Sequence, residues 1–472
     1  MHPRHMDTTI DINNGENQVM AHVDVVNNYF GQTPGVPEPK SVTVVAITGP
    51  AADAAAGMPT SANLIPLITD WLRTEEGQAV DKALRKRLPR LSFRYEKFVD
   101  NAVGRLAQQM DHERDTICAT IERELATNGN LTEAQRDMGH LIIRLMRMVT
   151  DMKHGATLDE ETCRLIKRVI GTEPTDDTIA DFSTIVYTET FRQVMTSVLR
   201  QSLREGDHPI LRHVYKNLLD INQEMARHFY GFFTGNKGQQ KNYLYIAWTM
   251  WGFLARRERQ RAEDDARASR PTLYDQLRGK RETRVINMNY TSLAQEASEG
   301  AIYFNGSLAD YVDMENNNDL RVENPRELDL VDFFENTLAP SIRLEGESAS
   351  LPVPSFMPPM KLKPVISRKY IATWYKAAQA IAEARHVLLL GCQADPRDTF
   401  FCDMLRANPT AKITMVDSDM ESSARDLCLA LQLNPNRYTP MRIQGHEARI
   451  YGNRVTVIAA SLEEIDISEW VR

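Results

Sequence analysis

The chain has few cysteines and no long apolar run, and both absences narrow what it can be. Its 472 residues include only five cysteines, and no two of them form a Cys-x-x-Cys pair. A zinc site built from paired thiolates and a secreted disulfide framework are therefore both disfavoured. No stretch approaches the roughly 20 apolar residues that a membrane-spanning helix requires, and the N-terminal MHPRHMDTTIDINNGENQ lacks the apolar core of a signal peptide. We expect a cytoplasmic protein with no metal site and no membrane partner.

The chain also lacks an excess of basic residues. Its 56 Lys and Arg are outnumbered by 64 Asp and Glu, for a formal net charge of −8. The overall basic character of a nucleic-acid-binding protein is therefore absent. The charge run ARRERQRAEDDARASR (255–270) mixes both signs, so we interpret it as a solvated helix face. Nucleic acid is not an expected partner.

The N-terminal part of the chain predicts a hairpin, one strand and a long helical block. Apolar and polar residues alternate around Asn14-Gly15, which is typical of a β-hairpin. GQTPGVPEPK (31–40) reads as a linker, and residues 42–47 predict a strand. From residue 71 to 268 the pattern is almost wholly helical, as in LTEAQRDMGHLIIRLMRMVTDM (131–152), where Thr132 and Gln135 form a capping box. DFSTIVYTETFRQVMTSVL (181–199) has a similar helical face.

After Pro271 short β-branched runs alternate with helical segments. The predicted strands are TRVINMNY (283–290), AIYFNGS (301–307), RHVLLLGC (385–392), AKITMVDSD (411–419) and NRVTVIAAS (453–461). Continuous apolar runs suit parallel strands that are buried on both faces, and the alternation predicts an α/β fold with a Rossmann-like, doubly wound sheet. Residues 310–364 should be a long irregular excursion. The expected organisation is a hairpin arm and linker (1–40), a Rossmann-like domain (41–70 and 271–472) and an all-helical insertion (71–270).

Glycines and polar residues follow several of these strands at the point where a ligand would bind. The carboxyl ends of parallel strands border the crevice that holds ligands in such folds. Gly49 and Gly57 permit a tight strand-to-helix turn, and the following helix N-terminus favours phosphate. Asn289 ends one strand, so its amide can be aimed at a sugar hydroxyl. Further residues of this kind are Asn305, Gly306, Ser307, Gly391 and Asp398.

The order of these segments resembles the sirtuin-like family, in its bacterial antiphage branches. There a phosphate-binding Gly-Ala-Gly-Ala-Ser and Gly-x-Pro precede a helical insertion, Thr-Asn-Tyr-Asp, Leu-His-Gly-Ser, a Pro-Pro…Lys…Trp segment, and a strand ending in Gly-Tyr-Ser with a downstream Asp. The matching residues over 42–461 are Gly49, Gly57, Pro59, Asn289, Tyr290, Gly306, Ser307, Pro358, Pro359, Lys361, Trp374, Gly391 and Asp398. The resemblance implies an NAD or ADP-ribose-type dinucleotide. It places Asn289 and Asn305 at catalytic positions and Gly49, Ala51, Asp53, Gly57, Pro59, Tyr290, Gly306, Ser307, Gly391, Cys392, Asp398 and Asp417 at cofactor-binding ones.

The departures from this pattern fall on its central chemistry. Ala51 and Asp53 replace a glycine and the serine of the first motif, and an acidic group there would repel phosphate. Pro50 removes a backbone N–H donor. Thr291 stands where the family has aspartate, and Cys392-Gln393 where it has tyrosine-serine. Asn305 replaces the family's histidine, and an amide cannot take a proton near neutral pH.

Two functions follow from this combination of matches and departures, and enzymatic activity stays open between them. The first is a non-catalytic or weakly active module that binds NAD or ADP-ribose, or assembles as a homo-oligomer through its N-terminal hairpin or helical block, in antiphage defence. The second is an NAD+ glycohydrolase that releases nicotinamide and depletes NAD in abortive infection, with Asn289 orienting water or ribose. Protein deacylation is disfavoured because the four-cysteine zinc module of that branch is missing.

Overall fold

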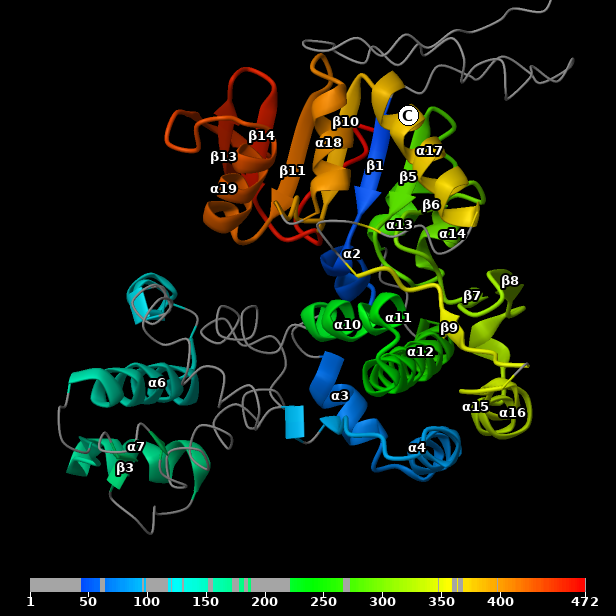
Figure 1. The fold of residues 1–472 in the computed structure, drawn as a ribbon. Helices are drawn as coiled ribbons and strands as arrows, with labels where there is room; N and C mark the ends of the chain where they lie inside the picture. The colour runs from blue at the N-terminus through cyan, green and yellow to red at the C-terminus, as the bar shows by residue number, and fades with distance from the viewer. Residues whose placement is uncertain are drawn as a thin grey trace, which may run out of the picture. The chain divides into compact units, whose positions relative to one another are not determined.

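A computed structural model of the chain provides the fold (Figure 1). The residues that it describes are 44–59, 64–95, 97–98, 118–119, 121–129, 131–151, 156–171, 178–181, 186–187, 221–265, 272–346, 348–358, 363, 368–396 and 398–471. The predicted N-terminal hairpin and linker lie outside the described residues. Within the part that is described, no helix has both the length and the apolar character that crossing a membrane requires.

The core of the fold is a mostly parallel sheet of eight strands. Its spatial order is β12-β13-β14-β11-β10-β1-β5-β6. The parallel strands are β1 (Val44–Thr48), β5 (Thr283–Asn287), β6 (Ile302–Tyr303), β10 (His386–Leu390), β11 (Lys412–Asp417) and β14 (Val455–Ala459). Numbered along the chain, these six strands have the spatial order 3-2-1-4-5-6, which is that of Rossmann folds. The predicted parallel sheet is confirmed, and all five of its later strands fall within the predicted runs.

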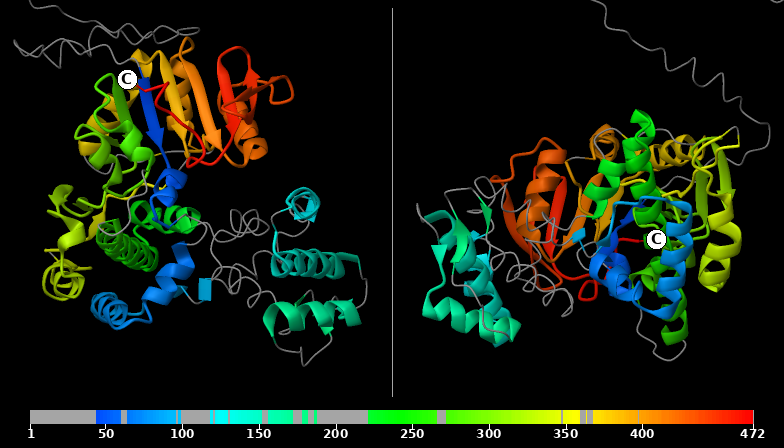
Figure 2. Two further views of the ribbon diagram at one scale, coloured as in Figure 1. Left: turned by 180° about the vertical axis from the view of Figure 1, so that it is seen from behind. Right: turned by 60° about the horizontal axis from the view of Figure 1, so that its bottom comes forward.

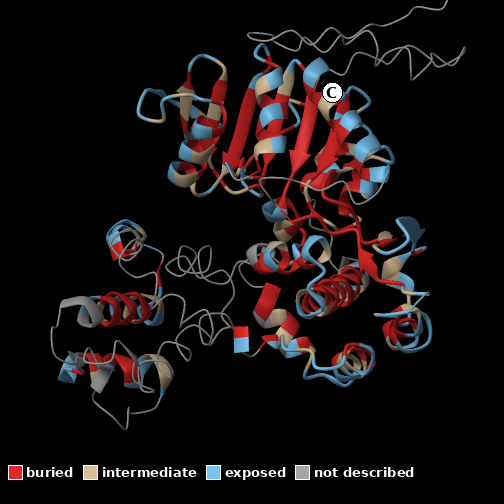
Figure 3. Cartoon of the chain, viewed as in Figure 1, coloured by how far each residue is buried: buried red, intermediate tan, exposed pale blue. Residues whose placement is uncertain are grey.

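Burial on both faces explains why these strands are continuous apolar runs. Every residue of β1 is buried, and so are the last four residues of β10 (Figure 3). Helices α17 (Arg368–Glu383), α18 (Thr399–Ala407) and α19 (Met420–Ala430) lie together on one side of the sheet (Figures 1 and 2). Helix α17 precedes β10, α18 joins β10 to β11, and α19 follows β11.

The strand register brings three predicted tips to one edge. The last residue of β1, Thr48, pairs with Leu390 of β10 on one side and with Asn287 of β5 on the other. The chain proceeds from β1 to β5 and β6 in one direction, and β10 then begins the other half of the sheet. The junction between β1 and β10 is therefore the topological switch point, where Rossmann-like folds bind their ligands.

The segment between β1 and β5 is mainly helical. Its principal helices are α2 (Pro50–Ala55), α3 (Leu64–Trp71), α4 (Glu75–Arg87), α6 (Glu133–Asp151), α7 (Glu160–Ile170), α10 (Ile221–Phe229), α11 (Gly231–Thr234), α12 (Lys237–Asp265) and α13 (Leu273–Leu277). The capping box before α6 is confirmed, because Thr132 N donates to Gln135 Oε1 (2.9 Å) and Gln135 N donates to Thr132 Oγ1 (3.2 Å).

The prediction that residues 71–270 are all helical is wrong in one place. A small antiparallel sheet contains β2 (Ala156–Thr157), β3 (Thr178–Asp181) and β4 (Val186–Tyr187). The predicted helix over 181–199 is therefore wrong at its beginning, and its remainder lies outside the described residues. Thr, Ile and Val in this segment favour strands, and cross-strand pairing prevailed over the helical spacing of the apolar residues.

Residues 310–364 also contain more regular structure than expected. A three-stranded sheet, in the order β8-β7-β9, is formed by β7 (Asp310–Asp313), β8 (Asn318–Arg321) and β9 (Pro352–Pro354). Short helical turns follow as η1 (Pro325–Glu327), α15 (Leu330–Asp332), η2 (Phe333–Leu338) and α16 (Ala339–Ser341). The hairpin of β12 (Thr439–Ile443) and β13 (His446–Tyr451) was not among the predicted elements. Its two-residue turn, Gln444-Gly445, has positive φ at both positions, as a type I′ turn requires.

Helix α12 is the buried centre of the helical block. Its residues 242–255 are buried on every side, and Trp248 and Trp251 donate to the carbonyls of Pro352 and Leu308 (both 2.8 Å). A helix that is apolar all round belongs inside a protein. The burial continues into the charge run, where Glu258 is only 3% exposed. Our interpretation of this run as a solvated helix face is therefore wrong for its first turns.

Candidate functional site

The turns after β1 and β10 are in direct contact at the switch point. Gly49 N donates to the Leu390 carbonyl (3.1 Å), and Ala51 N donates to the Gly391 carbonyl (3.2 Å). A Cβ on Gly49 would lie 2.4 Å from Gly391 O, and one on Gly391 would lie 2.7 Å from Ala51 Cβ. Glycine at both positions therefore serves the close packing of two turns. The predicted residues Gly49, Ala51 and Gly391 are together, but they contact one another.

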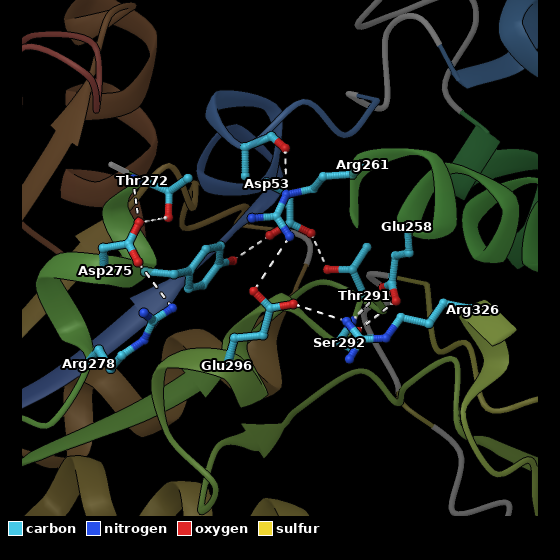
Figure 4. A network of polar contacts seen from close by, with 12 residues as sticks. Asp53, Glu258, Arg261, Thr272, Asp275, Arg278, Thr291, Ser292, Glu296 and Arg326 are labelled. Carbon is cyan, nitrogen blue, oxygen red and sulfur yellow. Dashed lines mark hydrogen bonds and ion pairs between the residues drawn. The ribbon is translucent and has the colours of Figure 1, made fainter. Parts of the chain in front are cut away.

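Asp53 of α2 turns its carboxylate into the protein rather than toward a phosphate site. The residue is 3% exposed, and its two oxygens accept hydrogen bonds from the hydroxyls of Tyr274 and Thr291 (Figure 4). Burial raises the pKa of this carboxyl to about 6, although the hydrogen bonds from Thr291 and Tyr274 and the charge of Arg261 act to lower it. The side chain of Asp53 is enclosed by its own partners, and its repulsion of phosphate stays a prediction.

Two of the departures from the sirtuin-like pattern contact each other. The family pattern has serine where this chain has Asp53 and aspartate where it has Thr291, so the hydroxyl and the carboxylate have exchanged places. Thr291 Oγ1 donates to Asp53 Oδ2. A hydroxyl–carboxylate hydrogen bond between the β1 turn and the segment after β5 can form with either arrangement. The two positions at which the sequence departs from the resembled pattern therefore contact each other.

Asn289 lies at the tip of β5 and is held through its backbone. Its N–H donates to Asn287 Oδ1 (3.1 Å), which also accepts from Thr48 Oγ1 (3.1 Å). Asn289 is 8% exposed, and its Nδ2 makes no hydrogen bond of good geometry with a described residue, although the amide is close enough to lower the pKa of Asp53. Neighbouring Tyr290 stacks on Phe356, with ring centroids 4.1 Å apart. Asn287 is a structural clamp that the sequence analysis did not identify.

Asn305 belongs to a buried polar triad with Lys363 and Asp398. Lys363 Nζ donates to Asn305 Oδ1 (2.9 Å) and lies 2.6 Å from Asp398 Oδ2. The side chains of this ion pair are 1% and 4% exposed, and the ammonium also lies 4.5 Å from the ring centre of Phe304. Burial lowers the pKa of Lys363, while the charge of Asp398 acts against that shift. Asp398 additionally caps α18 by accepting from Phe401 N (3.1 Å).

The lysine of this triad was not the one that the sequence analysis selected. The family pattern was matched to Lys361, which lies outside the described residues, whereas Lys363 fills the position beside Asn305. Both lysines belong to the run Lys361-Leu362-Lys363, in which lysine and leucine alternate. This alternation is the only feature of the sequence that points to Lys363. Spacing by two residues puts both side chains on the same side of an extended segment, so pattern alone cannot choose between them.

The other predicted residues are separated into several local environments. Gly306 has φ of 94° and lies against Ser355 O, while Ser307 Oγ donates to Asp310 Oδ2 (2.5 Å). Asp417, the last residue of β11, accepts a hydrogen bond from Ser423 Oγ of α19 (2.8 Å). Burial raises the pKa of the Cys392 thiol to about 12, so this cysteine is not a thiolate at neutral pH.

The Gly-x-Pro part of the first motif lies at the C-terminal end of α2. Gly57 has φ of 83° just past α2, and its carbonyl accepts from Arg257 Nη2 (3.0 Å). Pro59 follows and is half-buried. This motif therefore joins the β1 turn to α12.

A second carboxyl group, Glu258 on α12, lies close to this region and was missed. It accepts hydrogen bonds from Ser292 N and Ser292 Oγ (both 2.6 Å), and burial raises its pKa to about 7 (Figure 4). Arg261, one turn later, donates to Ala56 O (2.9 Å) and pairs with Glu296, which also pairs with Arg326. Glu258 lies seven and three residues after buried Trp251 and Ala255, so a continuation of the buried stripe could have revealed it.

Part of the predicted site is brought together by the fold. Gly49, Asp53, Asn289, Asn305, Gly391 and Asp398 lie at one edge of the sheet, and each contacts other groups of the chain. Among the described residues no three His, Cys, Asp or Glu side chains are grouped to hold a metal ion. In comparisons with known proteins, no family model matches the chain, and no match is found among curated proteins or solved structures.

Proposed function

We propose that this chain is a non-catalytic, sirtuin-like module of antiphage defence that acts in the cytoplasm. Its Rossmann-like domain (41–70 and 271–472) carries a helical insertion, and its dinucleotide crevice is stabilised by internal contacts instead of by a nucleotide. The observation that carries this proposal is the buried ammonium of Lys363, which bonds Asn305 and Asp398 at the position that the family resemblance assigns to catalysis.

The energetics of this ion pair favour a permanently filled site. Breaking a buried pair by removing one partner typically costs about 3–5 kcal/mol, because the remaining charge stays in a poorly solvated place. A nucleotide that displaced Lys363 would have to compensate that loss. The turns at Gly49 and Gly391 also pack closely against each other, so no group can be placed between them.

Assembly is the activity that such a module retains. A lone hairpin is only marginally stable in water, so the alternating segment around Asn14-Gly15 needs a partner, and strand pairing with a second copy would supply one. Light scattering of the full chain and of a chain without residues 1–35 tests this. We expect the mass to fall when the segment is removed, and an unchanged mass would count against the arm.

The catalytic part of the proposal is tested with NAD. We expect purified protein to release no nicotinamide from NAD, and calorimetry with NAD and ADP-ribose reports whether either nucleotide binds. Release that disappears in Asn289→Ala would overturn the non-catalytic assignment, and ligand heats without release would limit the function to nucleotide binding.

One observation favours the alternative, an NAD+ glycohydrolase. The amide nitrogen of Asn289 is buried beside the carboxyl of Asp53, and that carboxyl has a pKa of about 6, in the range of a general base. If nicotinamide is released, Asp53→Asn should lower the rate by about 10²-fold or more. A full rate in that variant would assign the base to another residue.

A further inference from the structure

A cavity lies beside the edge strand β6, away from the switch point. Its volume is about 1050 Å³, and its walls come from α12, α14 (Leu293–Ala297), β6, the ends of β7 and β8, and α17. Strand β6 is the outermost parallel strand, whereas the β1–β10 junction lies inside the sheet. Tyr290, Gly306 and Ser307, which were predicted to bind cofactor, border this cavity. The size is at the upper end of the range of small-molecule sites.

The charges around the cavity are balanced. Five acidic and four basic side chains line it. Lys369 pairs with Asp310 and Arg326 pairs with Glu296, so opposite charges neutralise each other within the walls. Glu258, the most buried of the acids, accepts two hydrogen bonds from Ser292. A strongly anionic or cationic ligand would find little net attraction here.

Hydroxyl groups are the other shared feature of the walls. Seven lining residues carry one: Tyr290, Ser292, Tyr303, Ser307, Ser355, Tyr370 and Thr373. Each hydroxyl offers one donor and two acceptor positions, so even those that already donate can accept. The hydroxyls of Tyr303 and Tyr370 are buried among protein atoms, beside the backbone of Gln295 and the side chain of Ser355 respectively, so the more exposed hydroxyls of the walls are the ones open to a ligand.

We propose that this cavity binds a small neutral ligand rich in hydroxyl groups, either a free monosaccharide or the ribose of a nucleoside. Neutrality follows from the balanced walls, and hydroxyl recognition follows from the density of groups that both donate and accept. The proposal does not depend on the non-catalytic assignment, because the cavity shares no wall with the Lys363–Asp398 pair.

Saturation-transfer NMR on the full chain tests this inference with ribose, glucose, adenosine and uridine, together with inorganic phosphate and putrescine as charged probes. We expect saturable binding of at least one neutral probe. If both nucleosides and sugars bind, the hydroxyl groups suffice for recognition. If only nucleosides bind, the ligand is the ribose of a nucleoside and not a free monosaccharide. Binding of only phosphate or putrescine, or of no probe, would overturn the proposal.

Two cavity-filling variants locate the site. Thr373→Trp on α17 and Gln295→Trp on α14 place an indole in the cavity from two different helices, and each should weaken binding at least tenfold. Ala372→Trp, next to Thr373 but exposed and outside the walls, is the matched control and should stay within twofold of wild type. Thermal unfolding checks that each variant is folded. Wild-type affinity in both folded variants would place the ligand elsewhere.

Discussion

Replacing Asp53 with asparagine should change the free energy of unfolding relative to wild type, and this difference should favour the variant more at pH 8 than at pH 4. The carboxyl is 3% exposed and has a pKa of about 6, against 3.8 for an ordinary aspartate. A shift of roughly two pH units corresponds to about 3 kcal/mol of free energy. Asparagine has nearly the same shape and no charge, so it should escape the penalty that wild type incurs once Asp53 ionises in its enclosed position.

The sign follows from proton binding. Between pH 3.8 and about 6 the folded state keeps the proton of Asp53 while the unfolded state has lost it. The free energy of unfolding of the wild type therefore falls as pH rises through this window and levels off above it. The asparagine variant has no such dependence, because its amide does not titrate. The difference between variant and wild type should move by about 2–3 kcal/mol in favour of the variant from pH 4 to pH 8.

Urea denaturation of both proteins at several pH values measures this difference. Comparison with the wild type is essential, because other groups titrate in the same range, including His386, whose pKa burial lowers to about 4. Thr291→Val is the matched control: it keeps the carboxyl, removes a donor that lowers its pKa, and should deepen the loss of stability at high pH. A pH-independent difference between Asp53→Asn and wild type would refute the reasoning.

Three further outcomes are expected. Asp398→Asn should lower the free energy of unfolding by about 3–5 kcal/mol by leaving Lys363 unpaired, and adding Lys363→Met should recover part of that loss; a double variant worse than the single one would contradict this. Gly306→Ala should cost more than about 2 kcal/mol, because its Cβ would lie 1.4 Å from Ser355 O at a positive φ. Gly279→Ala has positive φ but open space and should cost only about 1 kcal/mol, and equal losses would show that φ alone decides. In iodoacetamide labelling followed by mass spectrometry, half-buried Cys163 should react well before buried Cys392, whose pKa is raised to about 12; equal rates would contradict the burial of Cys392.

The parallel sheet could be predicted from sequence because each of its strands can be recognised from the residues within the strand. The runs at 283–290, 385–392, 411–419 and 453–461 each have a centre rich in apolar and β-branched residues, which suits strands that are buried on both faces. Weakly apolar strands carry no such signal. β2, β3 and β4 have two to four residues each, and only pairing between distant segments defines them.

The candidate site was only partly predictable, for a related reason. Glycine and asparagine after a strand show that the residue lies at the ligand-binding edge, and Gly49, Asn289 and Gly391 do lie there. Sequence could not show which way the side chains turn. Asp53 faces Tyr274, which is 221 residues away in the chain, and Lys363 reaches Asn305 across 58 residues.

The sequence by itself determined the class of fold and the edge at which ligands would be bound, since strand periodicity and strand-end residues are local properties. Only the tertiary structure decided that Asp53 bonds Tyr274 and Thr291, that Lys363 joins Asn305 to Asp398, and that open space lies beside β6. Those features depend on contacts between residues far apart in the chain and on how closely they pack.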